Sequence, residues 1–124
     1  MKLLTGVDLI EIDRLREAIA GHGERFLNRI FTVRELDENI RKPESLAGRF
    51  AAKEAVAKAF GSGIGDVSWK EIEILRAESG QPTLVLHGAA DEKAKEMKIV
   101  NWSVSISHTN GHAIAFVVGI SETN

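Results

Sequence analysis

The sequence contains no cysteine and no long apolar run, and each absence excludes a class of protein. Without cysteine, disulfides and thiolate metal sites are impossible, and a cytosolic location is the natural expectation. The longest apolar run, residues 113–118, is far shorter than the ~20 residues of a membrane-spanning helix. Asp8 and Glu11 lie too close to Met1 to leave room for a signal-peptide apolar region. We therefore expect a cytoplasmic protein that does not enter a membrane.

The sequence also lacks an excess of positive charge and the common nucleotide-binding motifs. A net charge of −2 argues against a general nucleic-acid binder, which would normally be strongly basic. The glycine-rich stretch at residues 61–65 lacks the lysine and the following helix of a P-loop. His22, His87 and His112 show no metal-ligand spacing. We therefore expect no nucleic-acid partner and no zinc site.

The overall composition is that of an ordinary folded protein. The chain has 124 residues, of which 44 % are hydrophobic and 27 % are charged. A chain of this length has room for one domain, 1–124, built around one modest core.

The first half of the chain shows mainly helical patterns. Residues 3–8 suit a short strand, after which Leu9, Ile12, Leu15 and Ile19 recur at helical spacing up to a glycine stop at residue 21. Residues 26–31 suggest a second short helix. Thr32, followed three residues later by Glu35, forms a capping-box pattern that predicts the start of a third helix. The strongest helix is predicted over residues 44–60, between a proline and a glycine-rich stop.

The second half shows mainly strand patterns. Residues 69–74 read as β-like, and a turn at 79–82 leads into a strand at 83–86. A helix is predicted over 88–97. Residues 102–106 alternate between apolar and serine side chains, and a hairpin signal at 110–111 leads into a partner strand at 112–119. This order predicts an α+β fold in which the N-terminal helices pack on a small antiparallel sheet.

The predicted helix over 44–60 carries several charged side chains on defined faces. Arg49 and Lys53 stack four residues apart, and Phe50, Glu54 and Lys58 form a second row. Glu54 and Lys58 are also in the favourable order for a simple surface ion pair, so this alternative stays open. Asp8, at the end of the predicted first strand, is by itself most typical of a helix cap.

These side chains also fit phosphoryl-transfer chemistry. Mg²⁺ takes one or two protein carboxylates and fills its other positions with water and substrate phosphates. Asp8 and Glu54 would supply the carboxylates, and Arg49, Lys53 and Lys58 the cations that offset phosphate charge. Nothing in the spacing places Asp8 next to Glu54. Residues 105–108, which include Ser107 and His108, end a strand at a turn whose free backbone amides would suit a phosphate.

Five arginines crowd one early stretch of the chain: Arg14, Arg16, Arg25, Arg29 and Arg34. Charged side chains are mostly exposed, so a solvated helical face explains them without any function. The alternative is a docking surface for an acidic partner.

Taken together, these motifs resemble the holo-acyl-carrier-protein synthase family, the short class of 4′-phosphopantetheinyl transferases. The resemblance covers nearly the whole chain. Its motifs are Gly6-Val7-Asp8, residues 26–32 with Glu35, residues 49–55 running on to 58–61, Gly80-Gln81-Pro82 and Ser105-Ile106-Ser107-His108.

The resemblance implies the fold, the assembly and the roles of individual residues. It implies an α+β phosphopantetheinyl transferase fold and a homotrimer with active sites between subunits. Asp8 and Glu54 would be the magnesium ligands, and Lys58 would lie near the reacting phosphates. The predicted coenzyme A contacts are Arg49, Lys53, Gly61, Ser107 and His108. Arg14, Arg25 and Arg29 would face an acyl carrier protein. Residues 39–45 are fewer than in some members of the family, so adenine contacts are not assigned there.

The implied reaction transfers the phosphopantetheine arm of coenzyme A to a carrier serine, in support of fatty acid biosynthesis. The serine hydroxyl attacks the β-phosphate, adenosine 3′,5′-bisphosphate leaves, and Mg²⁺, or Mn²⁺ in its place, neutralises the developing charge. Two other hypotheses remain. One is a non-catalytic docking module for an acidic partner. The other is a different Mg²⁺-dependent phosphotransferase or nucleotide hydrolase, although the missing P-loop counts against its common forms.

Overall fold

A computed structural model describes residues 1–39 and 41–123 of the chain. The elements of the described residues are, in chain order, β1 (Lys2–Glu11), α1 (Ile12–Ile30), α2 (Val33–Glu38), α3 (Pro43–Ala59), the short 3-10 helix η1 (Trp69–Glu71), β2 (Ile72–Arg76), β3 (Pro82–Leu86), α4 (Gly88–Glu96), β4 (Ile99–His108) and β5 (His112–Ser121). The predicted α+β architecture is confirmed. None of the helices described has the length and apolar character needed to cross a bilayer.

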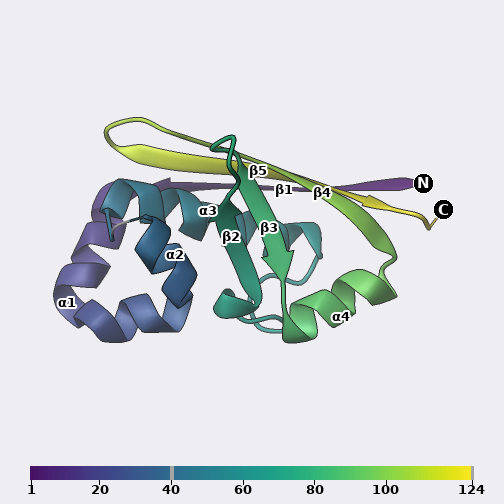
Figure 1. The fold of residues 1–124 in the computed structure, drawn as a ribbon, viewed down its shortest axis with the longest axis horizontal. Helices are drawn as coiled ribbons and strands as arrows, with labels where there is room; N and C mark the ends of the chain where they lie inside the picture. The colour runs from purple at the N-terminus through teal and green to yellow at the C-terminus, as the bar shows by residue number, and fades with distance from the viewer. Residues whose placement is uncertain (40, 124) are drawn as a thin grey trace.

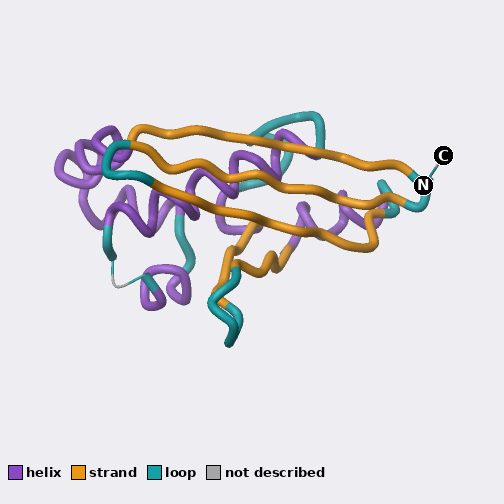
Figure 2. Tube along the Cα trace, turned by 90° about the horizontal axis from the view of Figure 1, so that it is seen from above, coloured by secondary structure: helices purple, strands orange, loops and turns teal. Residues whose placement is uncertain are grey.

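Three long strands form the main antiparallel sheet, in the order β1-β5-β4. β1 pairs with β5 along its whole length, from Lys2 opposite Ser121 to Glu11 opposite His112. Figure 2 shows the three strands side by side, and Figure 1 shows that the helices lie on one side of this sheet. β2 and β3 form a separate two-stranded sheet.

Helix α3 packs directly against the inner face of the sheet because small residues line the contact. A Cβ atom built on Gly6 of β1 would lie 1.8 Å from the carbonyl oxygen of Ala55. A Cβ on Gly48 of α3 would lie 2.7 Å from the Ile106 side chain. Only glycine fits at such approaches. The close packing of α3 on β1 brings the side chains of these two elements to one site.

The outer face of the sheet is apolar and exposed. Strand side chains alternate between the two faces, so every second residue of β1 and β5 points away from α3. The large apolar side chains exposed on this face are Leu3, Val7, Leu9, Ile114 and Phe116, with exposed fractions between 40 and 63 %. Within residues 1–39 and 41–123, no element covers this face.

Several locally coded features are confirmed. Thr32 Oγ1 accepts from the Glu35 backbone amide and the Glu35 carboxylate accepts from the Thr32 amide, which is the predicted capping box. The helix predicted over residues 44–60 is α3, with Pro43 in its first turn. The hairpin joins β4 to β5 around residues 109–111, where the Thr109 amide donates to the His112 carbonyl at 2.8 Å.

Three boundary predictions are wrong, and two of them, at Leu9 and Trp69, involve contacts with distant parts of the chain. Leu9 belongs to β1 rather than to a helix, because pairing with β5 extends the strand to Glu11. The first helix does not stop at Gly21; α1 is interrupted at Gly23, which has φ 52° and ψ −129°. Trp69 lies in η1 rather than in a strand, and its ring stacks on Phe50 at a centroid distance of 4.9 Å.

Candidate active site

The structure brings Asp8, Glu54 and Lys58 together, although about fifty residues separate Asp8 from the other two. Asp8 follows Gly6 on the inner face of β1, at the point where β1 touches α3. Glu54 and Lys58 are four residues apart on α3 and therefore share one side of the helix. The close approach at Gly6 thus supplies the proximity that spacing alone did not predict.

Lys58 joins the two elements by hydrogen bonds. Its ammonium donates to the Val7 carbonyl at 2.9 Å and to Asp8 Oδ1 at 3.0 Å. The Lys58 side chain is 51 % exposed and that of Asp8 is 19 % exposed. The ammonium that neutralises Asp8 is therefore accessible from solvent. A simple surface pair between Glu54 and Lys58 is not what the geometry shows.

The negative charge of Glu54 is less well neutralised than that of Asp8, which has the Lys58 ammonium at 3.0 Å. Burial raises its pKa, the neighbouring charge of Asp8 raises it further, and the Lys58 ammonium opposes both effects. Two carboxylates near one lysine leave a local excess of negative charge.

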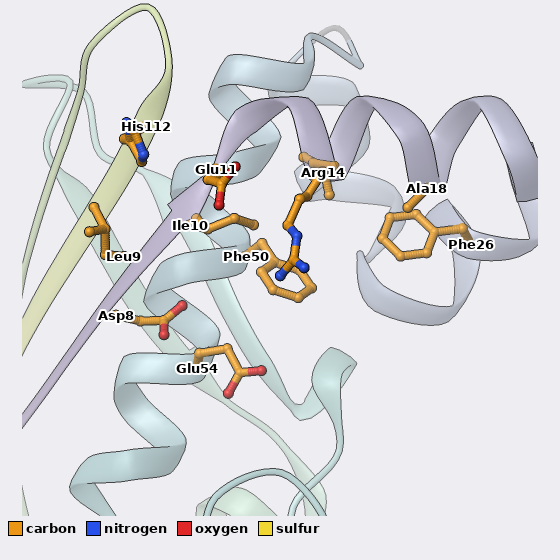
Figure 3. A pocket seen from close by; sticks show the side chains of 11 residues that line it. Asp8, Leu9, Ile10, Glu11, Arg14, Ala18, Phe26, Phe50, Glu54 and His112 are labelled. Atoms are coloured by element: carbon orange, nitrogen blue, oxygen red, sulfur yellow. The ribbon is translucent and has the colours of Figure 1, made fainter.

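A cavity of about 460 Å³ opens beside this cluster. Figure 3 shows the Asp8 and Glu54 carboxylates directed into it, with the guanidinium of Arg14 reaching in from α1. The complete lining is Asp8, Leu9, Ile10, Glu11, Arg14, Leu15, Ala18, Phe26, Phe50, Glu54 and His112. The cavity is therefore acidic at one end and apolar, with aromatic rings, at the other.

The donor set fits a magnesium ion that is shared with a phosphate ligand. In the part of the chain that the structure describes, no group of three or more His, Cys, Asp or Glu side chains gathers as a metal site. A pair of carboxylates that borders a cavity is instead the arrangement that suits Mg²⁺, since this ion keeps water and substrate oxygens as its other ligands.

Arg49 lies away from this cavity, and it is largely buried. Its exposed fraction is 8 %, and its Nε atom has no hydrogen-bond partner. Burial lowers its pKa and the like charge of Arg76 lowers it further, against the opposing effects of Glu38 and Glu35. The adjacent stretch of residues 39–45 contains residue 40, which is outside the described residues.

Lys53, another predicted coenzyme A contact, is completely buried in the core. Its side chain is 0 % exposed and lies 2.8 Å from the equally buried Glu35 carboxylate. Its ammonium also donates to the carbonyls of Trp69 and Ile72, at 2.9 and 2.6 Å. Burial lowers its pKa, an effect that the Glu35 charge opposes. Because its donors are used inside the fold, the assignment of Lys53 to coenzyme A is corrected to a structural role.

The remaining predicted contacts lie at other edges of the molecule. Gly61 is exposed, has φ 90° and follows α3 directly. Ser107 and His108 are exposed at the end of β4, with β5 between them and Asp8. Ser107 pairs with Ile114 and shares the outer face of the sheet. None of these three residues lines the cavity beside Asp8 within this chain.

Arg14, Arg25 and Arg29 are all exposed on α1. Arg14 precedes the interruption at Gly23 and lines the cavity, whereas Arg25 and Arg29 follow it, one helical turn apart. Arg29 borders a second hollow that also contains Lys70.

The sequence reasoning missed several residues of the cavity. Phe50 lies on the same helical row as Glu54, so its position was available from spacing, but an aromatic ring alone gave no reason to assign a role. His112 reaches the cavity because it pairs with Glu11 across β1 and β5. That pairing joins the two ends of the chain and leaves no local signal.

Comparison with known proteins places these features in a family. Residues 5–117 match the family model described as the 4′-phosphopantetheinyl transferase superfamily. The chain is 50 % identical, over a 125-residue alignment, to the holo-[acyl-carrier-protein] synthase of Herpetosiphon aurantiacus, with 95 % of this chain and 98 % of that protein covered.

Solved structures show the same fold. The Helicobacter pylori holo-[acyl-carrier-protein] synthase in complex with coenzyme A superposes with a TM-score of 0.88 and 35 % identity, over 94 % of this chain and 100 % of that chain. The Neisseria meningitidis holo-[acyl-carrier-protein] synthase superposes with a TM-score of 0.87 and 35 % identity, over 95 % and 98 %. Since the motif resemblance, the family match and the fold agree, the chain belongs to the 4′-phosphopantetheinyl transferase superfamily.

Proposed function

We propose that this chain has the activity of a holo-[acyl-carrier-protein] synthase. It transfers the 4′-phosphopantetheine group of coenzyme A to a serine of an apo-acyl carrier protein, in support of fatty acid biosynthesis. The products are holo-acyl carrier protein and adenosine 3′,5′-bisphosphate. We propose that residues 1–124 act as one transferase domain in the cytoplasm. The chain has no cysteine, and proteins of this reducing compartment rarely depend on disulfides.

One observation carries the proposal: Asp8 and Glu54 line a cavity, and Lys58 pairs with Asp8, in a chain of this family. A non-catalytic docking module would have no need for two carboxylates directed into a cavity. The partial burial that raises the Glu54 pKa has a stability cost, and such perturbed groups are concentrated at functional sites.

Asp8 and Glu54 would hold Mg²⁺, or Mn²⁺ in its place, which supplies charge neutralisation at the pyrophosphate of coenzyme A. The oxygen of the carrier serine forms a bond to the β-phosphorus, and the bond from that phosphorus to the departing bisphosphate breaks. One of the two carboxylates, directly or through a water molecule, accepts the serine proton. The Lys58 ammonium, half exposed and paired with Asp8, stabilises or protonates the leaving phosphate.

The other predicted contacts divide between the two substrates. Arg49, Gly61, Ser107 and His108 are proposed to contact the phosphates and nucleotide of coenzyme A. The buried Nε of Arg49 is a donor without a partner, which supports an anionic ligand there. Arg14, Arg25 and Arg29 are proposed to attract the carrier protein through their exposed charges.

We propose a homotrimer assembled through the outer face of the main sheet. Leu3, Val7, Leu9, Ile114 and Phe116 form an exposed apolar surface of the kind that marks an interface. Ser107 lies on this same face, so in such an assembly it would reach a neighbouring subunit rather than its own cavity. The exchange Phe116→Glu should reduce the mass measured by light scattering from three chains to one.

The decisive experiment incubates the protein with an apo-acyl carrier protein, coenzyme A and Mg²⁺, and then measures the intact mass of the carrier. The expected result is the addition of one phosphopantetheine, which disappears when EDTA removes the divalent ion. An unchanged carrier mass with bound carrier would favour a docking module. Hydrolysis of a nucleotide without carrier modification would favour a different phosphotransferase.

A further inference from the structure

The loop that follows α3, residues 61–66, contains three glycines and is fixed from inside by Ile64, which packs against the core, and by the Gly63 amide, which donates to the Ala57 carbonyl at 3.1 Å. Gly61, Gly63 and Gly65 have φ values of 90°, 71° and 147°, a region that favours glycine. A Cβ atom built on any of these three would meet no heavy atom within 4 Å. Glycine loses more conformational freedom on folding than any other residue, so contacts from other elements help to fix the exposed residues of this loop.

Lys93 of α4 provides such contacts from a distant part of the chain. Its ammonium donates to Ser62 Oγ at 2.8 Å and lies 3.4 Å from the Asp66 carboxylate. Its side chain is only 24 % exposed. These interactions connect one end of the loop to the other through a single cation, which a solvated surface lysine would not do.

The same lysine also rests on the end of α3. Its ammonium lies 5.9 Å from the centre of the Phe60 ring, within the range of a cation–π contact. Phe60 is 5 % exposed and packs edge-on against Trp102 of β4, at a centroid distance of 5.4 Å. The contact with a buried, well-packed ring therefore limits the positions that the Lys93 ammonium can take while it binds the loop.

The loop begins at the helical turn that carries Lys58. The Gly61 amide donates to the Lys58 carbonyl at 2.9 Å, so the direction of the loop is linked to the helix end. We infer that Lys93 is a positioning residue that holds residues 61–66 in the conformation that receives the coenzyme A phosphates. This inference rests on the proposed function, which places Gly61 beside that ligand.

The helix α4 offers a matched control. Lys95 lies two residues away and pairs with Asp91 within the same helix at 3.0 Å, with 76 % of its side chain exposed. Like Lys93→Met, the exchange Lys95→Met removes one ammonium group from α4. The contacts between Lys93 and the loop stay intact in this variant. Any general effect of losing a charge from α4 should appear in both variants.

The test measures steady-state kinetics with coenzyme A and the apo-carrier varied separately. Lys93→Met should raise the KM for coenzyme A about fivefold, since one hydrogen bond is typically worth that factor. The KM for the carrier should stay at the value of the Lys95→Met control. Lys93→Arg should recover most of the loss, because it restores a cation and several donors. Hydrogen exchange of residues 61–66 should accelerate in Lys93→Met alone.

A second variant keeps the test decisive if Lys93→Met folds poorly. Ser62→Ala removes the acceptor on the loop and leaves Lys93 in place, so by itself it should raise the KM for coenzyme A and leave that for the carrier unchanged. Where Lys93→Met folds, the two effects should not add. Equal rises in both KM values, additive effects, or a Lys93→Met enzyme that matches Lys95→Met would overturn the inference. The failure of the proposed function is distinguishable, because the parent enzyme would then leave the carrier mass unchanged.

Discussion

Two lysines of helix α3, five positions apart, form ion pairs of nearly the same length in opposite surroundings. Lys53 lies 2.8 Å from Glu35, and both side chains are 0 % exposed. Lys58 lies 3.0 Å from Asp8, and their side chains are 51 % and 19 % exposed. In the sequence, both lysines are cations of the same predicted helix. The family resemblance assigns both of them to the coenzyme A site.

The difference between the pairs lies in what else each charged group contacts. Lys53 also donates to two backbone carbonyls, and Glu35 accepts from the Thr32 and Ile74 amides. A buried pair needs such additional hydrogen bonds to offset its desolvation. The pair therefore connects α2, α3 and β2, and its hydrogen-bonding groups are engaged within the fold rather than with a ligand. In the Lys58–Asp8 pair, Asp8 lines a cavity, and a second carboxylate of that lining, Glu54, feels the charges of both partners. Charge surplus and access, rather than the presence of an ion pair, identify the site.

The largest expected effect comes from removing charge at the exposed cluster. Asp8→Asn and Glu54→Gln should each lower turnover by about 100-fold or more, since removal of one electrostatic stabiliser costs an enzyme this much. Both proteins should unfold at nearly the parent denaturant concentration. The measurement is the initial rate of carrier modification at matched Mg²⁺, beside chemical denaturation. Near-normal rates in both variants would return Asp8 and Glu54 to structural roles.

The buried pair should show the opposite pattern. Lys53→Met leaves the Glu35 carboxylate buried without its cation, which typically costs about 3–5 kcal/mol of stability. Lys58→Met, the control on the same helix, should cost under ~1 kcal/mol but lose most of its turnover. Urea unfolding and carrier modification distinguish the two. If Lys53→Met were stable but bound coenzyme A weakly, Lys53 would belong to the ligand site after all.

How far the sequence predicts this molecule depends on the range of the interactions involved. The capping box at Thr32 and Glu35 is set by neighbouring residues, and so was predicted correctly. The position of Leu9 in β1 depends on pairing with β5, about one hundred residues later in the chain, so helical spacing gave the wrong answer. Burial of Lys53 likewise depends on η1 and β2 closing over α3. Asp8 and Glu54 were candidates from their chemistry, but only the family resemblance placed them at one site, because their proximity arises from the Gly6 contact.

A smaller effect is expected for the arginines of α1, which lie outside both ion pairs. Reversing the charge of Arg14, Arg25 or Arg29 to Glu should raise the KM for the carrier several-fold and leave that for coenzyme A nearly unchanged. Exposed charges mainly govern encounter, and the Debye length falls from ~10 Å at 0.1 M salt to ~3 Å at 1 M. Added salt should therefore weaken carrier use by the parent enzyme and affect the reversed variants less. A rise confined to the KM for coenzyme A would place these arginines at the nucleotide instead.

The smallest effect concerns the ion pair of Glu73, which is more exposed than the Lys53–Glu35 pair and less exposed than the Lys58–Asp8 pair. Its side chain is 4 % exposed, and its partner His87, at 3.0 Å, is 50 % exposed. Burial alone raises the Glu73 pKa, but hydrogen bonds from Thr32 and His87, together with the charges of His87 and Arg34, outweigh it and the pKa is lowered.

The sign of the pH dependence follows from this lowered pKa. An unfolded chain binds the proton near pH ~4.3, whereas folded Glu73 binds it only at lower pH. Its contribution to stability is thus fully present above that pH and is lost as the pH falls through the folded value. Glu73→Gln should be about 1 kcal/mol less stable than the parent at pH 7, and the gap should close in acid. Thermal unfolding of both proteins between pH 7 and pH 3.5 measures this, with Glu96→Gln on exposed α4 as control. A gap that stays constant with pH would mean that Glu73 stabilises the fold through its shape and hydrogen bonds rather than its charge.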